Sequence, residues 1–362
     1  MTAPEPTPMN PSPDIQDIRL NLFGLDREGL REALTPLTAR RFHADQVFHW
    51  IYGRRETDPR RMSDLPAALR AAIDDRFRFA WPRTRVSGRS ADGSRKHLLT
   101  LEDGLEIEAV HMVHADRVTF CLSSQVGCAL DCAFCLTGTM GLRRQLGAGE
   151  IAGQVAALLA DGEVPIDQLR IVFMGMGEPL HNYDAVMAAF RILVDPQGFA
   201  LPPRRITLST AGLVPGIERL GREDPRPRLA VSLAAPTDAA RARLMPINRK
   251  WTLAKLLAAC RAFPLGPRER ITFEYVLLAG VNDSAGDAEA TARLLAGLRA
   301  KVNVIPYNEA GLHGFATPAA AVAARFRDVL LRRGMQASIR WSKGRDIGAA
   351  CGQLARTAAS AS

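Results

Sequence analysis

The order of apolar and polar residues divides the chain into a helical part, a short β part and a long alternating part. Apolar residues recur at helical spacing in three early segments, 26–36, 43–54 and 64–78, which predicts a small helical domain. Runs with β character follow at 96–101, 106–113 and 118–123, separated by the turn pairs Asp92-Gly93 and Asp103-Gly104. Residues 1–15 are rich in Pro, Thr and Ser, a composition that predicts a disordered tail.

From residue 148 onward, helical patterns alternate with short apolar strands. Helical patterns at 148–161 and 183–194 each precede a strand, and six strands are predicted, at 170–174, 205–209, 228–233, 272–277, 303–305 and 337–341. Strands separated by helices imply a parallel sheet. The predicted fold class is therefore α/β, a partial (β/α)6 barrel preceded by a small N-terminal basic helical domain and a short β extension. Its functional site is expected at the carboxyl ends of the strands.

Positive charge is concentrated in the early part of the chain. The formal net charge is +9, and residues 40–100 contain 14 Lys/Arg and 7 Asp/Glu, including the pairs Arg40-Arg41, Arg54-Arg55 and Arg60-Arg61. Any single pair is explained by a solvated surface, but their concentration indicates a module that contacts phosphates. The predicted segments are a tail at 1–15, a phosphate-contacting helical domain at 16–82, a β extension at 83–120, the barrel at 121–345, and a C-terminal loop and tail at 346–362.

Three of the six cysteines, Cys128, Cys132 and Cys135, form a Cys-x3-Cys-x2-Cys motif. Three thiolates are one too few for a closed zinc site and one too few to saturate a [4Fe–4S] cluster, so a cluster bound here keeps one iron open. A structural zinc site would need a fourth ligand, and none follows nearby. Packing alone explains the motif poorly, because Asp131 lies among the cysteines. No run of about 18 apolar residues occurs, and we expect a soluble cytoplasmic protein whose thiols stay reduced.

Polar residues follow successive predicted strands. Gly177 and Glu178 come after the strand at 170–174, while Ser209, Ser232 and Asn308 end later ones. Each residue is also explained as a helix cap or turn residue, but their recurrence at strand ends favours ligand contact.

Two further cysteines lie outside the motif in the sequence. Cys121 precedes it by seven residues, and Cys351 lies in a Gly-rich segment that suits a nucleophile on a loop. Cys260 falls at helical spacing with Leu256 and Leu257, as expected for an inert core residue.

These motifs together resemble the RlmN/Cfr-type radical S-adenosylmethionine (SAM) adenine methyltransferases of RNA. The resemblance covers residues 20–355 and is carried by Ser123–Cys135, Met174–Leu180, Arg205–Thr210, Met245–Asn248 and Ala349–Leu354. It implies a radical SAM barrel with a [4Fe–4S] cluster on Cys128, Cys132 and Cys135. The implied SAM pocket consists of Phe134, Gly177, Glu178, Ser209, Ser232, Leu233, Ala234 and Asn308.

The resemblance also implies a reaction. It implies that Cys351 is the methyl-carrying cysteine and that Cys121 releases the methylated RNA from it by forming a transient disulfide. It also implies that Glu108 is the acid/base carboxylate, with Glu106 a close competitor by sequence alone. Two SAM molecules are used per turnover to methylate C2 of adenosine in 23S rRNA and tRNA. The implied partners are these RNAs and a flavodoxin or ferredoxin as electron donor, with the chain acting as a monomer.

Alternatives remain open at this point. Adenine-C8 methylation uses the same parts, and a non-catalytic iron–sulfur RNA-binding or redox protein would explain the cluster and the charge. The chain also departs from the family pattern, because Ala234 replaces a common histidine and Arg345 and Gly348 replace common acidic residues. These changes bear on SAM affinity and RNA choice.

Overall fold

The N-terminal helices form a small unit with its own apolar core. The computed structural model describes residues 19–162 and 164–354, so the predicted tail at 1–15 lies outside the described residues. The unit contains α1 (Arg27–Leu34), α2 (Arg41–Phe48), a π-helical continuation (His49–Gly53), η2 (Pro59–Arg61) and α3 (Ala67–Arg76). A parallel pair of short strands, β1 (Leu20–Asn21) and β2 (Phe77–Arg78), joins its two ends. The three predicted helices are confirmed.

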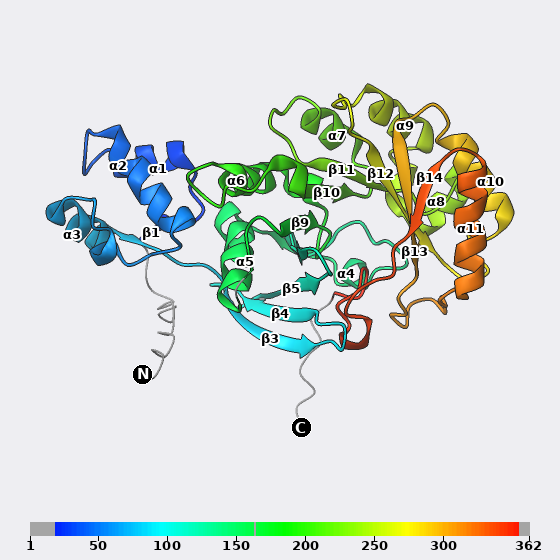
Figure 1. Ribbon diagram of the computed structural model, residues 1–362, viewed down its shortest axis with the longest axis horizontal. Helices are drawn as coiled ribbons and strands as arrows, with labels where there is room; N and C mark the ends of the chain where they lie inside the picture. Colours follow the sequence, from blue (N-terminus) through cyan, green and yellow to red (C-terminus); the bar gives the residue numbers. More distant parts are fainter. Residues whose placement is uncertain (1–18, 163, 355–362) are drawn as a thin grey trace.

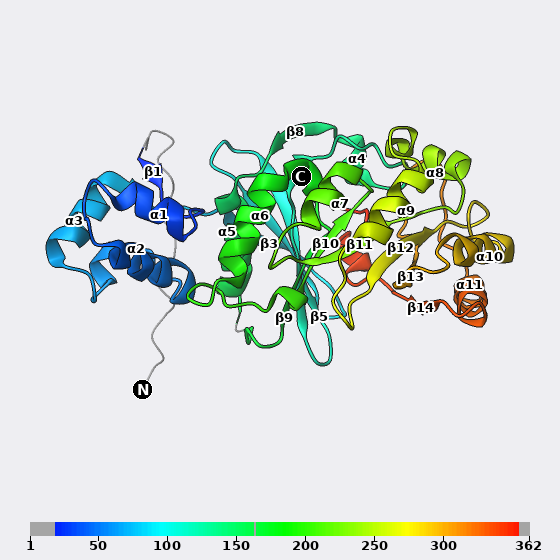
Figure 2. The same ribbon diagram turned by 90° about the horizontal axis from the view of Figure 1, so that it is seen from above.

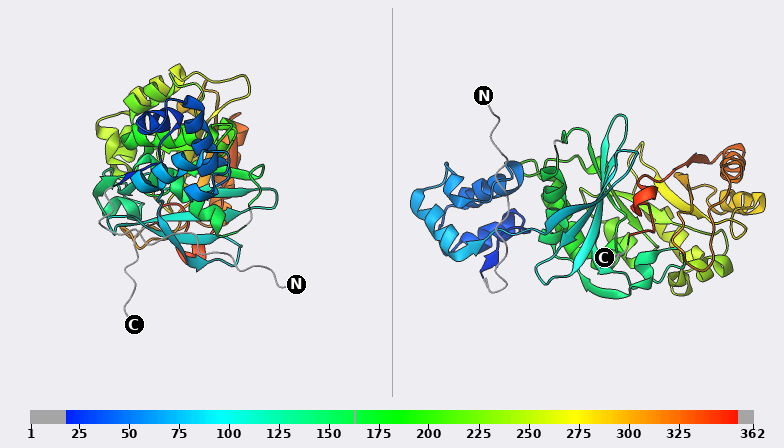
Figure 3. Two further views of the ribbon diagram at one scale, coloured as in Figure 1. Left: turned by 90° about the vertical axis from the view of Figure 1, so that its left-hand side faces the viewer. Right: turned by 90° about the horizontal axis from the view of Figure 1, so that it is seen from below.

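This N-terminal unit lies at one end of the molecule and contacts the barrel at its side (Figures 1 and 3). Arg78 of β2 forms an ion pair with Glu102, which belongs to the turn after β4. On the other side, a ring nitrogen of His49 lies 3.0 Å from the carbonyl oxygen of Gln197. Polar contacts therefore tie the unit both to the β extension and to the barrel.

A ten-stranded sheet forms the centre of the protein. Its order is β14-β13-β12-β11-β10-β9-β6-β5-β4-β3. The antiparallel part consists of β3 (Arg83–Arg89), β4 (Arg95–Thr100) and β5 (Glu106–Val113), which continues to β6 (Val118–Cys121). The parallel part consists of β6, β9 (Leu169–Phe173), β10 (Ile206–Thr210), β11 (Arg228–Ser232), β12 (Ile271–Leu277), β13 (Ala300–Pro306) and β14 (Gln336–Ile339).

Strand β6 joins the two parts, because it pairs antiparallel with β5 and parallel with β9. The predicted boundary at residue 120 therefore falls inside a strand. The six strands predicted after the cysteine motif are all present, so the parallel part of the ten-stranded sheet contains seven strands when β6 is included.

Helices cover the outer face of the parallel strands (Figures 1 and 2). They are α5 (Ala148–Ala160), α6 (Tyr183–Val194), α7 (Val214–Leu220), α8 (Asp238–Leu244), α9 (Leu253–Ala262), α10 (Ala285–Leu294) and α11 (Ala320–Arg332), with short 3-10 turns at η3 (Pro179–Asn182), η4 (Pro203–Arg205), η5 (Pro246–Arg249) and η6 (Arg345–Ile347). The predicted α/β partial barrel is confirmed. Cys260 is 1% exposed in α9, as expected of a core residue. Within residues 19–162 and 164–354, no helix has the length and apolar character needed to cross a membrane.

Candidate active site

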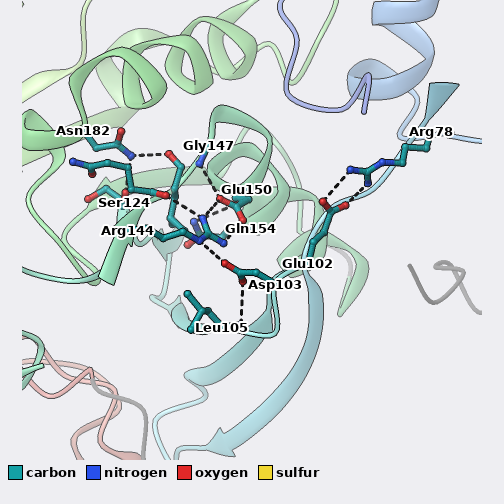
Figure 4. Close-up of polar contacts among 12 residues, drawn as sticks. Arg78, Glu102, Asp103, Leu105, Ser124, Arg144, Gly147, Glu150, Gln154 and Asn182 are labelled. Carbon is teal, nitrogen blue, oxygen red and sulfur yellow. Dashed lines mark hydrogen bonds and ion pairs between the residues drawn. The ribbon is translucent and has the colours of Figure 1, made fainter. Parts of the chain in front are cut away.

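The three cysteines of the motif lie on a loop that is fixed at both ends. Strands β7 (Gln125–Gly127) and β8 (Leu142–Gln145) pair antiparallel on either side of the loop and of the short helix α4 (Leu136–Thr139). Figure 4 shows Arg144 of β8 between two carboxylates: its Nε donates to Asp103 at 2.5 Å, and its Nη1 and Nη2 donate to Glu150 at 2.8 Å each. These charge-assisted bonds connect the far end of the loop to α5 and to the β4–β5 turn.

The three thiols share one cavity of about 160 Å³. Burial raises the pKa of Cys128 to about 12 and that of Cys132 well above its ordinary value, and the neighbouring motif thiols add to both shifts. In a cubane cluster each thiolate binds a different iron, so the sulfurs need not meet at one point. The described residues contain no three His, Cys, Asp or Glu side chains arranged around a single metal ion. A donor set of three clustered thiols fits a [4Fe–4S] cluster with one open iron.

Most of the predicted site residues line this same cavity. Together with the three motif cysteines, the cavity is lined by Phe134, Gly177, Glu178, Ser209, Ser232, Asn308 and Cys351. Parallel strands place their carboxyl ends at one edge of the sheet, which is why residues far apart in sequence meet here.

Leu233 and Ala234 are the exceptions in the predicted SAM pocket, because both side chains are buried behind the cavity. Ala234 has a φ of 60°, and its carbonyl oxygen accepts from Asn282 at 2.7 Å. The carbonyl oxygen of Ala234 therefore already has a partner within the protein.

Glu178 is positioned with its carboxylate facing backbone donors. Its Oε2 accepts from the Ala211 N–H at 2.7 Å and its Oε1 from the Leu180 N–H at 3.0 Å. Burial raises the pKa of Glu178 to about 7, and these two hydrogen bonds oppose the rise. Gly177 before it has a φ of +98°, and a Cβ there would lie 2.5 Å from the Cβ of Gln125. Only glycine therefore brings this turn so close to the cluster loop.

Arg241 is a residue of the site that the sequence reading missed. It is completely buried in α8, and its guanidinium donates to the carbonyl oxygens of Ala211 (2.6 Å), Ser232 (3.0 Å) and Leu233 (3.1 Å) and to Asn248 (2.8 Å). It thus joins the ends of β10 and β11, where Ser209 and Ser232 line the cavity. Asn248 belongs to the Met245–Asn248 motif, and its contact with the buried Arg241 explains the asparagine of that motif.

Replacing Arg241 with methionine is expected to destabilise the protein by about 3 kcal/mol or more, because three buried carbonyl oxygens lose their donor. SAM binding should weaken as well, since the ends of β10 and β11 are no longer joined. Urea unfolding and equilibrium dialysis with SAM measure the two effects. Arg243→Met is the matched control, because Arg243 is exposed on the same helix. Equal losses in the two variants would contradict this role of Arg241.

The loop that carries Cys351 packs against the cluster loop. The Leu136 N–H donates to the Gly352 carbonyl oxygen at 2.8 Å, and the Thr137 hydroxyl donates to that of Leu354 at 2.5 Å. Asn308 donates from Nδ2 to the Cys351 carbonyl oxygen at 3.1 Å. In this arrangement Asn308 positions the Cys351 loop, a contact that the sequence did not predict.

The β3–β4 hairpin holds the other side of the Cys351 loop (Figure 1). Asp346 accepts from the Ser90 hydroxyl at 2.6 Å, and Asp92 accepts from the Gly344 N–H at 2.9 Å. Lys96 of β4 donates to the Gly348 carbonyl oxygen at 3.3 Å. The β extension therefore supports the loop that carries the predicted nucleophile.

Cys121 and Glu108 lie beside the cavity, and neither lines it. Cys121 is buried, and its pKa is raised to about 12 by burial and by the nearby Cys351 thiol. Glu108 is 2% exposed and forms an ion pair with Lys96, with 2.7 Å between Nζ and Oε1. In the strand register Cys121 is paired with Val110, two residues from Glu108. Side chains alternate along a strand, so Glu108 and Cys121 share one face of the sheet.

Comparisons with known proteins agree with this site. Residues 20–78 match the ribosomal RNA large subunit methyltransferase N-terminal domain, and residues 122–295 match the radical SAM superfamily, whose members use SAM and a [4Fe–4S] cluster. The dual-specificity RNA methyltransferase RlmN of Syntrophotalea carbinolica is 50% identical over 94% of this chain and 90% of its own length. The protein of the same name from Anaeromyxobacter dehalogenans is 46% identical over 94% and 93%.

A solved structure supports the same assignment. The crystal structure of a radical SAM methyltransferase from Sphaerobacter thermophilus superposes with a TM-score of 0.85 at 44% identity, covering 92% of this chain and 99% of that one. Identity at this level over nearly the whole length is shared by members of one family. The chain therefore belongs to the RlmN family of radical SAM RNA methyltransferases.

Proposed function

We propose that this protein methylates C2 of adenosine in 23S rRNA and in tRNA, with Cys351 as the methyl carrier. The observation that carries the proposal is that Cys351 and the three cluster cysteines line one cavity together with Glu178, Ser209 and Ser232. A cluster alone would explain three cysteines. It would not explain a fourth thiol brought to them from the C-terminus by a loop that is hydrogen-bonded on two sides.

The chemistry follows from the reactivity of C2, which is too poor in electrons to attack the methyl group of SAM. When bound, SAM and the cluster supply a methyl group and a 5′-deoxyadenosyl radical, from two SAM molecules per turnover. The Cys351 thiol gives up its proton and takes the methyl group on Sγ. Loss of a hydrogen atom from this S-methyl group leaves a carbon radical, which adds to C2 and tethers RNA to protein.

Release of the RNA needs a base and a second thiol. The adduct is a radical, and it must lose one electron and the C2 proton to restore the aromatic ring. The electron would pass to the cluster, which the cleavage of SAM leaves oxidised, and we assign the removal of the C2 proton to Glu108. The Cys121 thiolate then attacks the Cys351 Sγ, the bond from sulfur to the RNA methylene breaks, and the methylene takes a proton to become a methyl group. A two-electron donor must reduce the resulting disulfide before the next turnover. Glu108 is favoured over Glu106 because it is buried and close in register to Cys121, whereas Glu106 is half-buried.

The remaining assignments concern the surroundings of the reaction. We place Phe134 against the adenine of SAM, and Gly177, Glu178, Ser209, Ser232 and Asn308 around the rest of it. A flavodoxin or ferredoxin would supply electrons, and the chain would act as a monomer in the cytoplasm, where its thiols stay reduced. We assign residues 16–82 to RNA binding, 83–120 to support of the Cys351 loop, 121–345 to the barrel and 346–362 to the carrier loop and tail.

Arginines of the N-terminal unit are expected to contribute to RNA binding. Arg60 and Arg61 pair with Asp58 and Glu56 but remain largely exposed, while Arg40 and Arg55 are exposed with no ion pair inside the described ranges. The double variant Arg40→Ala/Arg55→Ala should bind RNA more weakly, and the slope of log Kd against log salt should fall by about 0.7–0.9 per lost phosphate contact. Fluorescence anisotropy over a salt series measures both. An unchanged salt slope would show that Arg40 and Arg55 do not contact RNA phosphates.

The proposal as a whole is tested by following the methyl group. Enzyme reconstituted with iron and sulfide under anaerobic conditions is given SAM with a deuterated methyl group, a reductant and RNA. We expect the label first on the Cys351 peptide and then, retaining two of its deuterium atoms, on adenosine. Label that reaches RNA with all three deuterium atoms would rule out a carrier that loses hydrogen.

A further inference from the structure

A second cavity, of about 480 Å³, opens at the other end of the barrel interior. The strands themselves show where it lies. In β9, Arg170 near the amino end lines the larger cavity, while Met174, just beyond the carboxyl end, lines both the larger cavity and the cysteine cavity. In β11, Arg228 lines the larger cavity and Ser232 lines the cysteine cavity. These residues are four positions apart and therefore share one face of the sheet. The larger cavity is thus the amino-end mouth of the barrel, on the same inner face as the active site.

The mouth is strongly basic. We define the basic mouth as Arg170, Arg204, Arg228, Arg268, Arg270 and Lys301, which all line the cavity. Each of the six is exposed, and none has an ion pair or side-chain hydrogen bond within residues 19–162 and 164–354. Burial and the nearby Arg117, Arg228 and Arg205 lower the pKa of Arg170, as expected where like charges crowd together. Among the acidic residues that line the cavity, Glu269 already faces Arg226 at 3.5 Å.

Asp116 near Arg170 and Glu274 near Lys301 offset only part of this charge. An excess of like charge destabilises the free protein and stabilises a complex with a polyanion. The arginines of the N-terminal unit differ in this respect, since several of them have a carboxylate partner. The mouth is therefore the better candidate for tight phosphate contact.

The mouth and the active site are adjacent. Three residues, Met174, Glu274 and Arg340, line both cavities. Arg340 lines the cysteine cavity together with Cys351, and Cys121 is paired in register with Val172, which lines the mouth. This boundary therefore lies beside both reactive cysteines, and both raise the pKa of Arg340. A group that enters through the mouth and stops at Arg340 would lie next to the methyl carrier.

We propose that RNA docks with its phosphates on the basic mouth, and that the target nucleotide is extruded into the barrel from the amino ends of the strands until its base reaches the Met174–Glu274–Arg340 boundary. This inference rests on the proposed function. A cavity of this volume suits a small ligand such as one nucleotide. Enzymes that modify a base take it out of the stack and pay a few kcal/mol for unstacking, which the phosphate contacts offset here.

An acidic electron-donor protein is the other partner that a basic surface fits. The concave shape and the continuity with Cys351 favour RNA, because a donor needs only to approach the cluster and has no reason to line a passage to the methyl carrier. A chemical reductant removes the protein donor from the assay and so separates the two partners.

The first experiment uses Arg170→Ala/Arg228→Ala with dithionite as the reductant. Its matched control is Arg325→Ala/Arg332→Ala. This variant removes the same charge from exposed positions of α11 that do not line the basic mouth. We expect the mouth variant to bind a stem-loop RNA roughly tenfold more weakly at 0.1 M salt, with a slope of log Kd against log salt lower by about 1.5. Methylation of Cys351 and cleavage of SAM without RNA should equal those of the control. If the Arg170→Ala/Arg228→Ala variant fails to fold, Arg204→Ala/Arg268→Ala gives the same test, because neither of these two arginines lies in a strand.

The second experiment narrows the passage without changing its charge. Thr207 lines the mouth on β10, and Thr207→Phe is expected to bind RNA as wild type does but to lose RNA methylation by at least about tenfold, with Cys351 methylation kept. The proposal would be overturned if Arg170→Ala/Arg228→Ala had the same RNA affinity and the same salt slope as the control variant. It would also be overturned if RNA methylation by that variant were impaired with a flavodoxin as donor but not with dithionite. Full RNA methylation by Thr207→Phe would overturn the route. Failure of the proposed function is distinguishable, because the wild-type enzyme would then methylate no RNA.

Discussion

Replacing Cys351 with alanine is expected to lower methyl transfer to RNA by at least about 10³-fold while leaving the content of the [4Fe–4S] cluster unchanged. In the proposed reaction the Cys351 thiol is the methyl acceptor, and no other described thiol of the cavity is free for that task if the motif cysteines bind iron. The Cys351 loop meets the cluster loop through backbone carbonyl oxygens and the Thr137 hydroxyl, so loss of the thiol leaves these contacts in place. Iron and sulfide analysis and labelled methyl transfer measure the two quantities.

Cys260→Ala is the control for this experiment, because it removes a buried thiol in α9 that does not line the cavity. It should retain methylation. Loss of the cluster from Cys351→Ala would contradict the separation of carrier from cluster ligands, and methylation at the wild-type rate would exclude Cys351 as the carrier.

Replacing Cys121 with alanine is expected to stop the reaction one step later and to trap RNA on the protein. In the proposed reaction, methyl transfer to Cys351 and addition to C2 do not need Cys121, but release of the RNA does. The nearby Arg340 lowers the pKa of Cys121 and opposes the larger effects of burial and Cys351, so it would stabilise the attacking thiolate. A denaturing gel should show a protein band shifted by RNA, and nuclease digestion followed by mass spectrometry should find adenosine joined to the Cys351 peptide.

The double variant Cys121→Ala/Cys351→Ala supplies the control, since it should give no shifted band. Normal turnover by Cys121→Ala would show that another group resolves the adduct. A shifted band in the double variant would mean that the attachment point is not Cys351.

The strands of the parallel sheet and the polar residues at their ends were predictable, because apolar runs mark the strands and a parallel sheet gathers their carboxyl ends. The role of Phe134 was implied only by the family resemblance. Strand β3 was not predicted, since Arg83–Arg89 is mostly exposed and polar and shows no apolar alternation. The sequence placed Lys96 in a basic surface stretch, yet its side chain is 8% exposed and paired with Glu108. Single charged residues carry no signal of burial, because burial depends on partners that the fold brings from elsewhere.

Two features of the site needed the tertiary structure. Arg241 looked like any helical arginine, and only the meeting of the β10 and β11 ends shows that it satisfies three carbonyl oxygens. The residues of the basic mouth are spread from 170 to 301, and the sheet gathers them. A signal was present, because basic residues stand at the amino ends of several predicted strands, as at Arg170 and Arg228.

Nucleoside mass spectrometry is the most direct test of whether the enzyme methylates C2 of adenosine in RNA. The samples are rRNA and tRNA treated with the reconstituted enzyme, SAM and reductant, and the standards are 2-methyladenosine and 8-methyladenosine. We expect 2-methyladenosine in both RNA fractions, and none when Cys351→Ala replaces the wild type. 8-Methyladenosine would contradict the assignment of C2. The absence of any methyladenosine, from a preparation that still cleaves SAM, would contradict the assignment of RNA adenosine as the substrate.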